Sequence, residues 1–406
     1  MINISTLFDP RYVFLIYVPV LFALNKRVGH RMLIALTLAE WMNQILKWLL
    51  AGERPYWYVH ERAHELAMAR NATLASDHLY RVGGASAAAD EEPSLIGAPP
   101  TTTTTVALKQ FPVTCELGAG SPSGHSMVTA TVWYILIDAL FKGELFGASE
   151  RATKSVASAQ LQNKLASLSW TVYGLMLVAV GLSRVYLACH FPHQCLCGAL
   201  LGALIARTVI EHLPMERLNK SHFCLATALM FSSALGTYAL LTALGMDPLW
   251  SVHKAMRWCA KKEYIHLDTT PFFSMMRYLG VCLGAGLAYD GRKIISSADG
   301  RKGCASAAKC AADDTALAPK QQHWTLVVAL VARRALAASL AIAFGQFLLA
   351  VPVPKSNQNV FYAISLVIYT AFAFVSAQTA PALAKRLTRV AQTDNNNSNI
   401  HRLKSQ

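Results

Sequence analysis

The sequence is poor in charged residues, and its cysteines lack the spacing of disulfide-rich or zinc-binding domains. Only 15% of the 406 residues are charged, 54% are hydrophobic, and the mean hydropathy is +0.33. This composition is too apolar for one or two ordinary water-soluble domains, so we expect a membrane protein. Nine cysteines occur without a Cys-x-x-Cys pair, which argues against a disulfide framework and against a zinc site.

Acidic side chains are outnumbered by basic ones. The chain has 37 Lys and Arg against 23 Asp and Glu, which gives a formal charge of +14 and a pI near 9.4. A nucleic-acid partner is not expected, because basic groove-binding domains do not carry repeated apolar runs of bilayer length. The cations must instead sort to one side of a membrane or surround a bound anion.

Apolar runs of bilayer length recur along the chain. About nine stretches reach or approach the roughly 17 to 25 residues that cross a bilayer, which predicts an all-α, polytopic membrane protein. No Lys or Arg precedes Arg11, so we expect an uncleaved first anchor with its N-terminus outside. The predicted spans lie near residues 12–24, 32–51, 125–141, 169–187, 194–210, 222–245, 271–290, 324–351 and 360–383.

The basic residues favour this topology. Loops assigned to the cytosol hold roughly twenty Lys and Arg, against about a dozen on the other side. The segment from Lys254 to Lys262 opposes the assignment, because its four basic residues fall in a loop placed outside, and a miscounted span there would invert everything after it. The chain is thus predicted to be one membrane domain over 1–383 with a cytosolic basic tail over 384–406.

The longest hydrophilic segment runs from about Tyr56 to Gly124. We expect a luminal insertion at about 62–108, whose middle is rich in alanine, acidic residues and threonine and is predicted to be low-complexity and disordered. The sequon at Asn71 could be glycosylated only if this segment is luminal or extracellular. Sequons at Asn219 and Asn396 fall in predicted cytosolic segments and are expected to be unused.

Two cations lie at the end of the second apolar run. Lys47 interrupts the run and Arg54 follows two helical turns later, so both are expected on one helical face near its outer end. Burying them costs several kcal/mol unless an anion compensates, which points to anion binding. Alternatively, Lys47 extends to the membrane interface and Arg54 is an ordinary anchor.

A turn-rich segment, Gly-Ser-Pro-Ser-Gly-His, ends at the start of the next apolar run. Its Ser123 and Gly124 could form an anion-binding nest at a helix N-terminus, and His125 could donate a proton to the bound group. A plain loop with a surface histidine is the alternative.

A third segment joins the fourth and fifth predicted spans. Arg184 and His190 are six residues apart and would not share a helical face, so a turn is expected between them. Pro192 fits the first turn of the following helix, whose N-terminus favours a neutral imidazole and a bound anion. Gln194 could hold the second ring nitrogen of His190. The alternative is a structural histidine near a loop.

In the nine-span topology, all three segments reach the same side of the membrane, where they predict a phosphate site. The order Lys-x6-Arg-Pro, Pro-Ser-Gly-His and Ser-Arg-x5-His resembles the signature of the acid phosphatase superfamily, which includes lipid phosphate phosphatases and vanadium haloperoxidases. The flanks at 47–57, 110–116 and 182–194, with the segment 254–271, resemble the glucose-6-phosphatase catalytic subunit family. This similarity is dense from Ile34 to Gly280.

The resemblance implies an endoplasmic reticulum enzyme with nine spans around a phosphatase helix-bundle core and a luminal active site. It would hydrolyse glucose 6-phosphate to glucose and phosphate, the terminal step of glucose production, without a metal or cofactor. His190 would be the nucleophile that forms a phosphohistidine, and His125 the general acid and base. Lys47, Arg54 and Arg184 would hold the phosphate oxygens.

Further implications concern the neighbourhood of the site. Gln194 stands where much of the superfamily has Asp, a replacement that the glucose-6-phosphatase branch shares. The insertion between Pro55 and Pro122 is longer than usual for the family and could leave the site intact or cover it. A luminal site also implies a partner that transports hexose phosphate into the lumen.

The sequence leaves two other functions and the role of the C-terminal basic motif open. A lipid phosphate phosphatase would share every catalytic residue, although such proteins typically have about six spans. A transporter or non-catalytic scaffold could also use buried cations. At the C-terminus, Arg402 and Lys404 resemble a dibasic retrieval signal, and a plain basic tail is the alternative.

Overall fold

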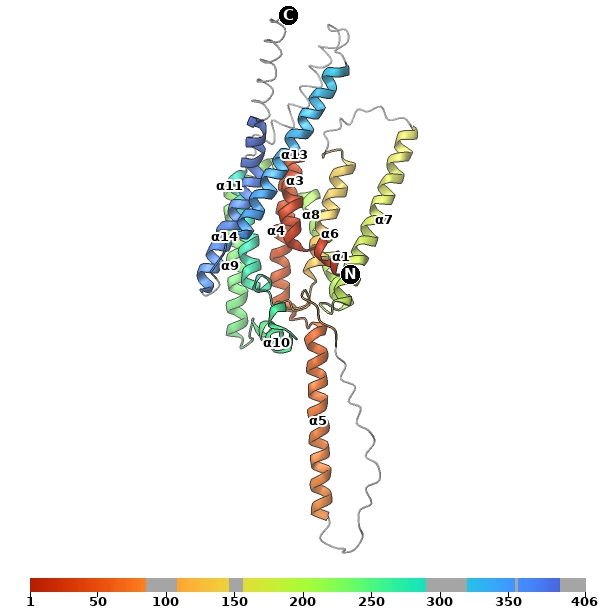
Figure 1. Cartoon of the computed structure of the whole chain (residues 1–406), viewed down its shortest axis with the longest axis vertical. Coiled ribbons are helices and arrows are strands. Elements are labelled where there is room, and N and C mark those ends of the chain that lie inside the picture. The colour runs from red at the N-terminus through yellow and green to blue at the C-terminus, as the bar shows by residue number, and fades with distance from the viewer. Residues whose placement is uncertain (85–107, 146–155, 290–319, 355–356, 388–406) are drawn as a thin grey trace, which may run out of the picture.

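The computed structural model describes residues 1–84, 108–145, 156–289, 320–354 and 357–387, and within these ranges every regular element is a helix (Figure 1). The membrane-domain helices pack side by side, and one long helix projects from one end of the bundle. The elements are α1 (Ile2–Leu7), α2 (Pro10–Tyr12), η1 (Val13–Tyr17), α3 (Val18–Leu24), α4 (Lys26–Leu50), α5 (Pro55–Gly84), α6 (Gly124–Phe141), α7 (Val156–Tyr186), α8 (Pro192–His212), η2 (Met215–Arg217), α9 (Lys220–Ala243), α10 (Trp250–Trp258), η3 (Lys262–Tyr264), η4 (Leu267–Thr269), α11 (Pro271–Ala288), α13 (Lys320–Ala350), α14 (Gln358–Phe374) and η5 (Val375–Thr379).

The prediction of an all-α polytopic membrane protein is confirmed. Seven helices within the described ranges are long and apolar enough to cross a membrane, and the apolar helix Val13–Leu24 is shorter. The remaining predicted span corresponds to α4, whose inner residues Glu40, Asn43 and Gln44 make it more polar than the others. Each predicted span therefore coincides with a helix.

Helix α4 forms the centre of the bundle. It begins after Asn25, whose side chain caps the helix by accepting a 2.9 Å hydrogen bond from the backbone N–H of Arg27. It packs against α3, α6, α8, α9 and α11, which buries about half of its length. It ends at Ala51, whose φ of 42° is left-handed and stops the helical hydrogen-bond pattern.

Helices α6 and α8 approach at backbone distance, which fixes two parts of the site relative to each other. A Cβ atom at Gly198 would lie 2.4 Å from the carbonyl oxygen of Ser123, and one at Gly202 would lie 2.2 Å from that of Met127. Only glycine allows this approach, and the spacing of four residues is typical of close helix packing in membranes. Thr131 adds a 3.0 Å hydrogen bond from its hydroxyl to the carbonyl of Gly202.

Ion pairs identify the two ends of the bundle. At one end, Arg31 lies 2.9 Å from Glu144, and Arg27 pairs with Glu216, which joins three of the loops predicted to be cytosolic. At the other end, Nζ of Lys254 lies 2.7 Å from Oε1 of Glu53. The basic segment from Lys254 to Lys262 therefore lies at the end opposite those loops, as the predicted topology requires.

The first part of the predicted insertion is helical, and its low-complexity middle lies outside the described residues. Helix α5 continues to Gly84 and projects from the bundle (Figure 1). Asn71 is exposed on this helix. Residues 85–107 lie outside the described ranges. So do the end of the basic tail, Asn396, and the segment with Arg402 and Lys404.

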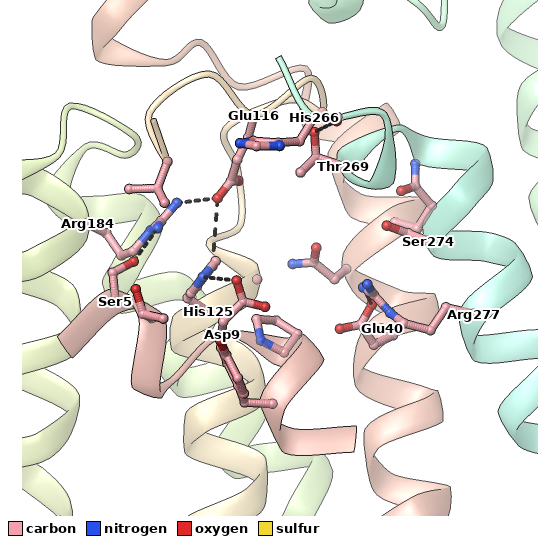
Figure 2. Close-up of a pocket in the computed structure, with 18 of the residues that line it drawn as sticks. Ser5, Asp9, Glu40, Glu116, His125, Arg184, His266, Thr269, Ser274 and Arg277 are labelled. Carbon is pink, nitrogen blue, oxygen red and sulfur yellow. Dashed lines mark hydrogen bonds and ion pairs between the residues drawn. The ribbon is translucent and has the colours of Figure 1, made fainter. Parts of the chain in front are cut away.

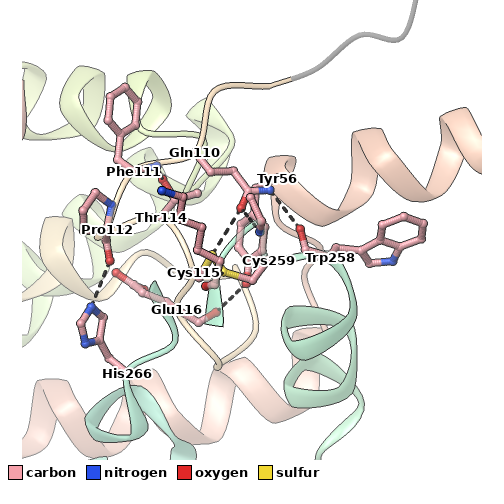
Figure 3. The surroundings of a disulfide bond; sticks show 12 residues. Tyr56, Gln110, Phe111, Pro112, Thr114, Cys115, Glu116, Trp258, Cys259 and His266 are labelled. Carbon is pink, nitrogen blue, oxygen red and sulfur yellow. Dashed lines mark hydrogen bonds between the residues drawn. A yellow bond between two sulfur atoms is a disulfide. The ribbon is translucent and has the colours of Figure 1, made fainter. Parts of the chain in front are cut away.

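One disulfide joins Cys115 to Cys259, although the sequence argued against a disulfide framework (Figure 3). The bond links the segment that returns from the insertion to the end of α10, across 144 residues of sequence. Nearby, Nε2 of Gln110 donates a 3.0 Å hydrogen bond to the carbonyl of Trp258. Pairing two distant, isolated cysteines needs no motif, which is why the spacing did not predict it.

Candidate active site

The predicted phosphate-site residues converge at the end of the bundle that carries α5 and α10. Lys47 lies in the last turn of α4, His125 in the first turn of α6, and Arg184 in the last turn of α7. His190 lies in the turn before α8, as expected. Arg54 is the exception, because α4 ends first and Arg54 lies in the link to α5, so it does not share a helical face with Lys47.

Arg54 is fully buried and held by backbone carbonyls. Its Nε donates to the carbonyl of Gly118 at 2.7 Å, its Nη1 to that of Cys189 at 3.1 Å, and its Nη2 to that of Ala119 at 3.2 Å. These bonds fix the guanidinium plane before any ligand arrives. A buried cation without a counter-charge costs several kcal/mol, so the site must contain an anion.

His190 is also fully buried, and its surroundings decide which nitrogen is protonated. Nδ1 lies 2.8 Å from the carbonyl oxygen of Gly120 and 3.3 Å from Oε1 of Gln194, so Nδ1 carries the proton and donates it. Nε2 faces Nη1 of Arg54 at 3.4 Å and keeps its lone pair. Gln194 is anchored in turn, because its Nε2 donates to the carbonyl of Glu53 at 2.7 Å.

The electrostatic environment keeps His190 neutral. Burial, followed by the positive charges of Arg54 and Arg184, holds the pKa of the His190 imidazole well below its ordinary value. Glu116 opposes this shift but does not reverse it. A neutral ring with a bare Nε2 is the form that can attack phosphorus.

Glu116, to which the sequence assigned no role, lies between Arg184 and His125 (Figure 2). Its Oε2 lies 2.9 Å from Nη2 of Arg54, and its Oε1 pairs with Nη2 of Arg184. The same carboxylate lies 3.8 Å from Nδ1 of His125 and 3.9 Å from Nε2 of His190. Both predicted catalytic histidines and two of the three predicted phosphate-binding cations thus surround one carboxylate.

The arginines around Glu116 favour its ionised form. Burial alone would raise the pKa of this carboxyl, but Arg184 and Arg54 outweigh burial and hold the pKa well below its ordinary value. The site therefore contains three cations, Lys47 included, and the two carboxylates of Glu116 and Asp9. The cations outnumber the carboxylates, which favours binding of a phosphate monoester.

The N-terminal segment completes one wall of the site. The hydroxyl of Ser5 in α1 accepts a 2.7 Å hydrogen bond from Nη1 of Arg184, and Oδ2 of Asp9 lies 3.9 Å from Nε2 of His125 (Figure 2). Each ring nitrogen of His125 therefore faces a carboxylate. Neither Ser5 nor Asp9 belongs to a motif, so only the fold reveals their position.

A cavity of about 430 Å³ opens beside this cluster. Lys47, Gly124, His125 and Arg184 line it, whereas Arg54 and His190 are buried in contact with Glu116, which itself faces the cavity. The volume falls within the range of roughly 300 to 1,000 Å³ that is usual for small-molecule sites.

Ser123 serves the scaffold around the site. Its N–H donates to the carbonyl of Gln194 at 3.0 Å, and its hydroxyl accepts a 3.3 Å hydrogen bond from Ser126. The cavity is lined by Gly124 and His125, the next two residues. A direct contact between Ser123 and phosphate therefore stays a prediction.

Comparison with known proteins agrees with this geometry. Residues 29–217 match the PAP2 superfamily. The chain is 35% identical over 300 residues to glucose-6-phosphatase 2 of Mus musculus, an overlap of 74% of this chain and 73% of the relative. It is 36% identical over 304 residues to glucose-6-phosphatase catalytic subunit 1 of Rattus norvegicus, an overlap of 74% and 71%. No solved structure matches the chain. This multi-pass membrane protein belongs to the glucose-6-phosphatase family of the PAP2 superfamily.

Proposed function

We propose that the protein hydrolyses glucose 6-phosphate to glucose and inorganic phosphate through a phosphohistidine at His190. One observation carries the proposal: a buried carboxylate, that of Glu116, is held by Arg54 and Arg184 within 4 Å of His125 and His190. A phosphoryl group that displaces this carboxylate would meet both arginines and both histidines at once.

The chemistry follows from the protonation states. Nε2 of His190 attacks phosphorus and forms the P–N bond, while the bond from phosphorus to the sugar oxygen breaks. His125 gives its proton to that oxygen as glucose leaves. Water then attacks the phosphohistidine, His125 takes a proton from the water, and the P–N bond breaks to release phosphate.

The cations supply the electrostatic stabilisation. Phosphoryl transfer spreads negative charge over the equatorial oxygens, and positioned donors in a water-poor site stabilise that charge. Arg54 is held by three carbonyls and Arg184 by Ser5, so little reorganisation is needed during the reaction. Lys47 would complete the set from the cavity wall.

For location, we propose the endoplasmic reticulum membrane, with the N-terminus and active site luminal and the C-terminus cytosolic. The disulfide at Cys115 lies at the site end, and disulfides persist in oxidising compartments such as the reticulum lumen. Substrate made in the cytosol would then have to cross the membrane, so we propose functional coupling to a glucose 6-phosphate transporter.

The test uses the full-length protein purified in detergent. We expect phosphate release from glucose 6-phosphate to exceed release from phosphatidate, and His190→Ala to abolish both. An alkali-stable, acid-labile label should appear on the wild type with phosphate-labelled substrate and be absent from His190→Ala. A preference for phosphatidate would reject the substrate, and unchanged turnover in His190→Ala would reject the mechanism.

A further inference from the structure

The cavity extends beyond the phosphate cluster along a polar face of α4 that phosphoryl transfer does not use. Glu40, Asn43 and Gln44 line the cavity together with Lys47 at its phosphate end. These positions share one helical face, and Glu40 lies about 10 Å from Lys47 along the axis. From α11, Ser274 and Arg277 face the same space (Figure 2).

Part of this face has a structural explanation. Nη2 of Arg277 lies 2.6 Å from Oε2 of Glu40, and this buried ion pair ties α11 to α4. The amide of Asn43 is also committed, because its Nδ2 donates to the carbonyl of Pro122 at 3.1 Å. Helix packing therefore accounts for these particular contacts.

Two residues that line the cavity each carry a donor without such an explanation. Among the groups that the structure describes, Nε2 of Gln44 and Nε of Arg277 are buried without a hydrogen-bond partner. The side chain of Gln44 is only 4% exposed, and that of Arg277 only 7%. A buried donor without a partner is destabilising, and polar groups at membrane depth are typical of substrate sites.

We propose that this polar face, with Gln44 as its specificity-determining residue, binds the hydroxyl groups of the substrate's sugar ring. The amide of Gln44 would donate to one hydroxyl, and the carboxylate of Glu40 would accept from another. The inference rests on the proposed function and adds how the sugar is recognised. About 10 Å of polar wall suits one hexose ring and its phosphate ester.

The same wall discriminates against lipid phosphates. An acyl chain in this part of the cavity would lie against Gln44, Glu40 and Arg277 and offer them no hydrogen bond. A site built to bind hydroxyl groups rejects ligands that lack them, because its buried polar groups are then left unpaired. Polyhydroxylated monoesters are thus the substrate class that this end of the cavity fits.

The experiment compares two substrates on two variants of the purified full-length protein. Gln44→Leu removes the amide at similar volume. The matched control Thr37→Val alters a buried polar residue on the same helix whose hydroxyl bonds to the carbonyl of Leu33 at 2.8 Å. We expect Gln44→Leu to lower kcat/KM for glucose 6-phosphate roughly tenfold, mainly through KM, and to leave phenyl phosphate within about twofold. Thr37→Val should change neither.

A series of monodeoxy glucose 6-phosphates locates the contact. Removing the hydroxyl that Gln44 binds should abolish the difference between wild type and Gln44→Leu, whereas removing any other hydroxyl should preserve it. If Gln44→Leu fails to fold, Gln44→Met replaces it in the same comparison.

The outcomes separate the two proposals. Suppose that the wild type cleaves glucose 6-phosphate and that Gln44→Leu lowers kcat/KM equally for both substrates or for neither. The sugar subsite is then overturned and the proposed function stands. If wild type cleaves phenyl phosphate but no sugar phosphate, the proposed function falls, and the subsite falls with it.

Discussion

Oε2 of Glu116 lies 2.9 Å from Nη2 of Arg54, at the point where a phosphate oxygen would have to sit. The second oxygen of the same carboxylate pairs with Arg184. The resting site therefore contains its own anion, and if Arg54 and Arg184 hold the phosphate as we propose, substrate binding exchanges one anion for another. The apparent affinity for phosphate is a difference between the two sets of contacts.

Replacing Glu116 with glutamine should strengthen phosphate binding. The amide in Glu116→Gln would be a neutral competitor, so we expect the inhibition constant of inorganic phosphate to fall about tenfold, which corresponds to roughly 1.4 kcal/mol. The variant should also unfold at lower temperature without phosphate, because Arg54 and Arg184 lose their counter-charge, and regain stability when phosphate is added.

Glu211→Gln is the matched control, since Glu211 forms an exposed pair with Arg207 at 2.9 Å on α8. It should change neither quantity. Weaker phosphate binding in Glu116→Gln would show that the carboxylate supports the anion site and does not compete for it.

The low pKa of His190 predicts an acid-sensitive fold. The unfolded imidazole takes up a proton near its ordinary pKa of about 6.5, whereas the folded one does not, so the unfolded state binds more protons below that pH. The contribution of His190 to stability is thus complete above pH 6.5 and is lost progressively as the pH falls below that value.

Thermal unfolding of wild type and His190→Asn between pH 7.5 and 5 measures this difference. Glu116 does not interfere in this window, because its lowered pKa matters only below the ordinary carboxyl pKa of about 4.3. Parallel pH dependences for the two proteins would contradict a neutral, buried His190.

Gln194 should affect the rate more than binding. Its Oε1 lies 3.3 Å from Nδ1 of His190, and its Nε2 anchors it to Glu53. Gln194→Ala removes one of two acceptors for the Nδ1 proton, so we expect kcat to fall roughly 10- to 100-fold with little change in KM. Gln194→Glu should recover part of the rate of phosphohistidine formation, and a loss confined to KM would argue against a role in orienting the ring.

The disulfide should be present and necessary. Cys115 immediately precedes Glu116, so opening the bond frees the segment that carries the carboxylate. We expect Cys115→Ser with Cys259→Ser to lose about 2 to 5 kcal/mol of stability and most activity. Cys224→Ser, at an exposed free cysteine, is the control. Alkylation of unreduced microsomal protein tests the bond directly, because modification of Cys115 before reduction would disprove it.

Asn71 should carry a glycan. It is exposed on α5, about 24 Å along the helix from its start at the bundle, and it lies at the end that carries the site. Glycosidase treatment should shift the mobility of the wild type and leave Asn71→Gln unchanged. Asn219, which caps α9 at the opposite end, should be unmodified, and a glycan there would reverse the orientation.

The sequence predicted the features that depend on neighbouring residues, namely the membrane spans and the short motifs beside helix ends. Each predicted apolar run of bilayer length coincides with a helix in the described part of the chain, and the order of Lys47, His125, Arg184 and His190 along the sequence indicates a phosphate site. These features depend on the bilayer length and on side chains that adjoin helix ends, both of which can be read along the chain.

Features that depend on long-range contacts could not be predicted. Glu116 is a single carboxylate in a loop, and only the fold places it between two arginines. The position of Arg54 beyond the end of α4 was missed, although Gly52 and Pro55 are typical of a helix end, because the left-handed residue itself is an alanine. Asp9 and Ser5 reach the site from a segment that is far away in sequence.

Glu116 also makes the site select between anions according to how many negative charges they carry. Chloride or a simple carboxylate carries one negative charge and would only replace like with like, so such ions have little advantage over the resident side chain. A phosphomonoester brings two negative charges to a cluster with three cations and gains from the exchange. We therefore expect the enzyme to work undisturbed among abundant monovalent anions, and its product phosphate to be its principal inorganic inhibitor.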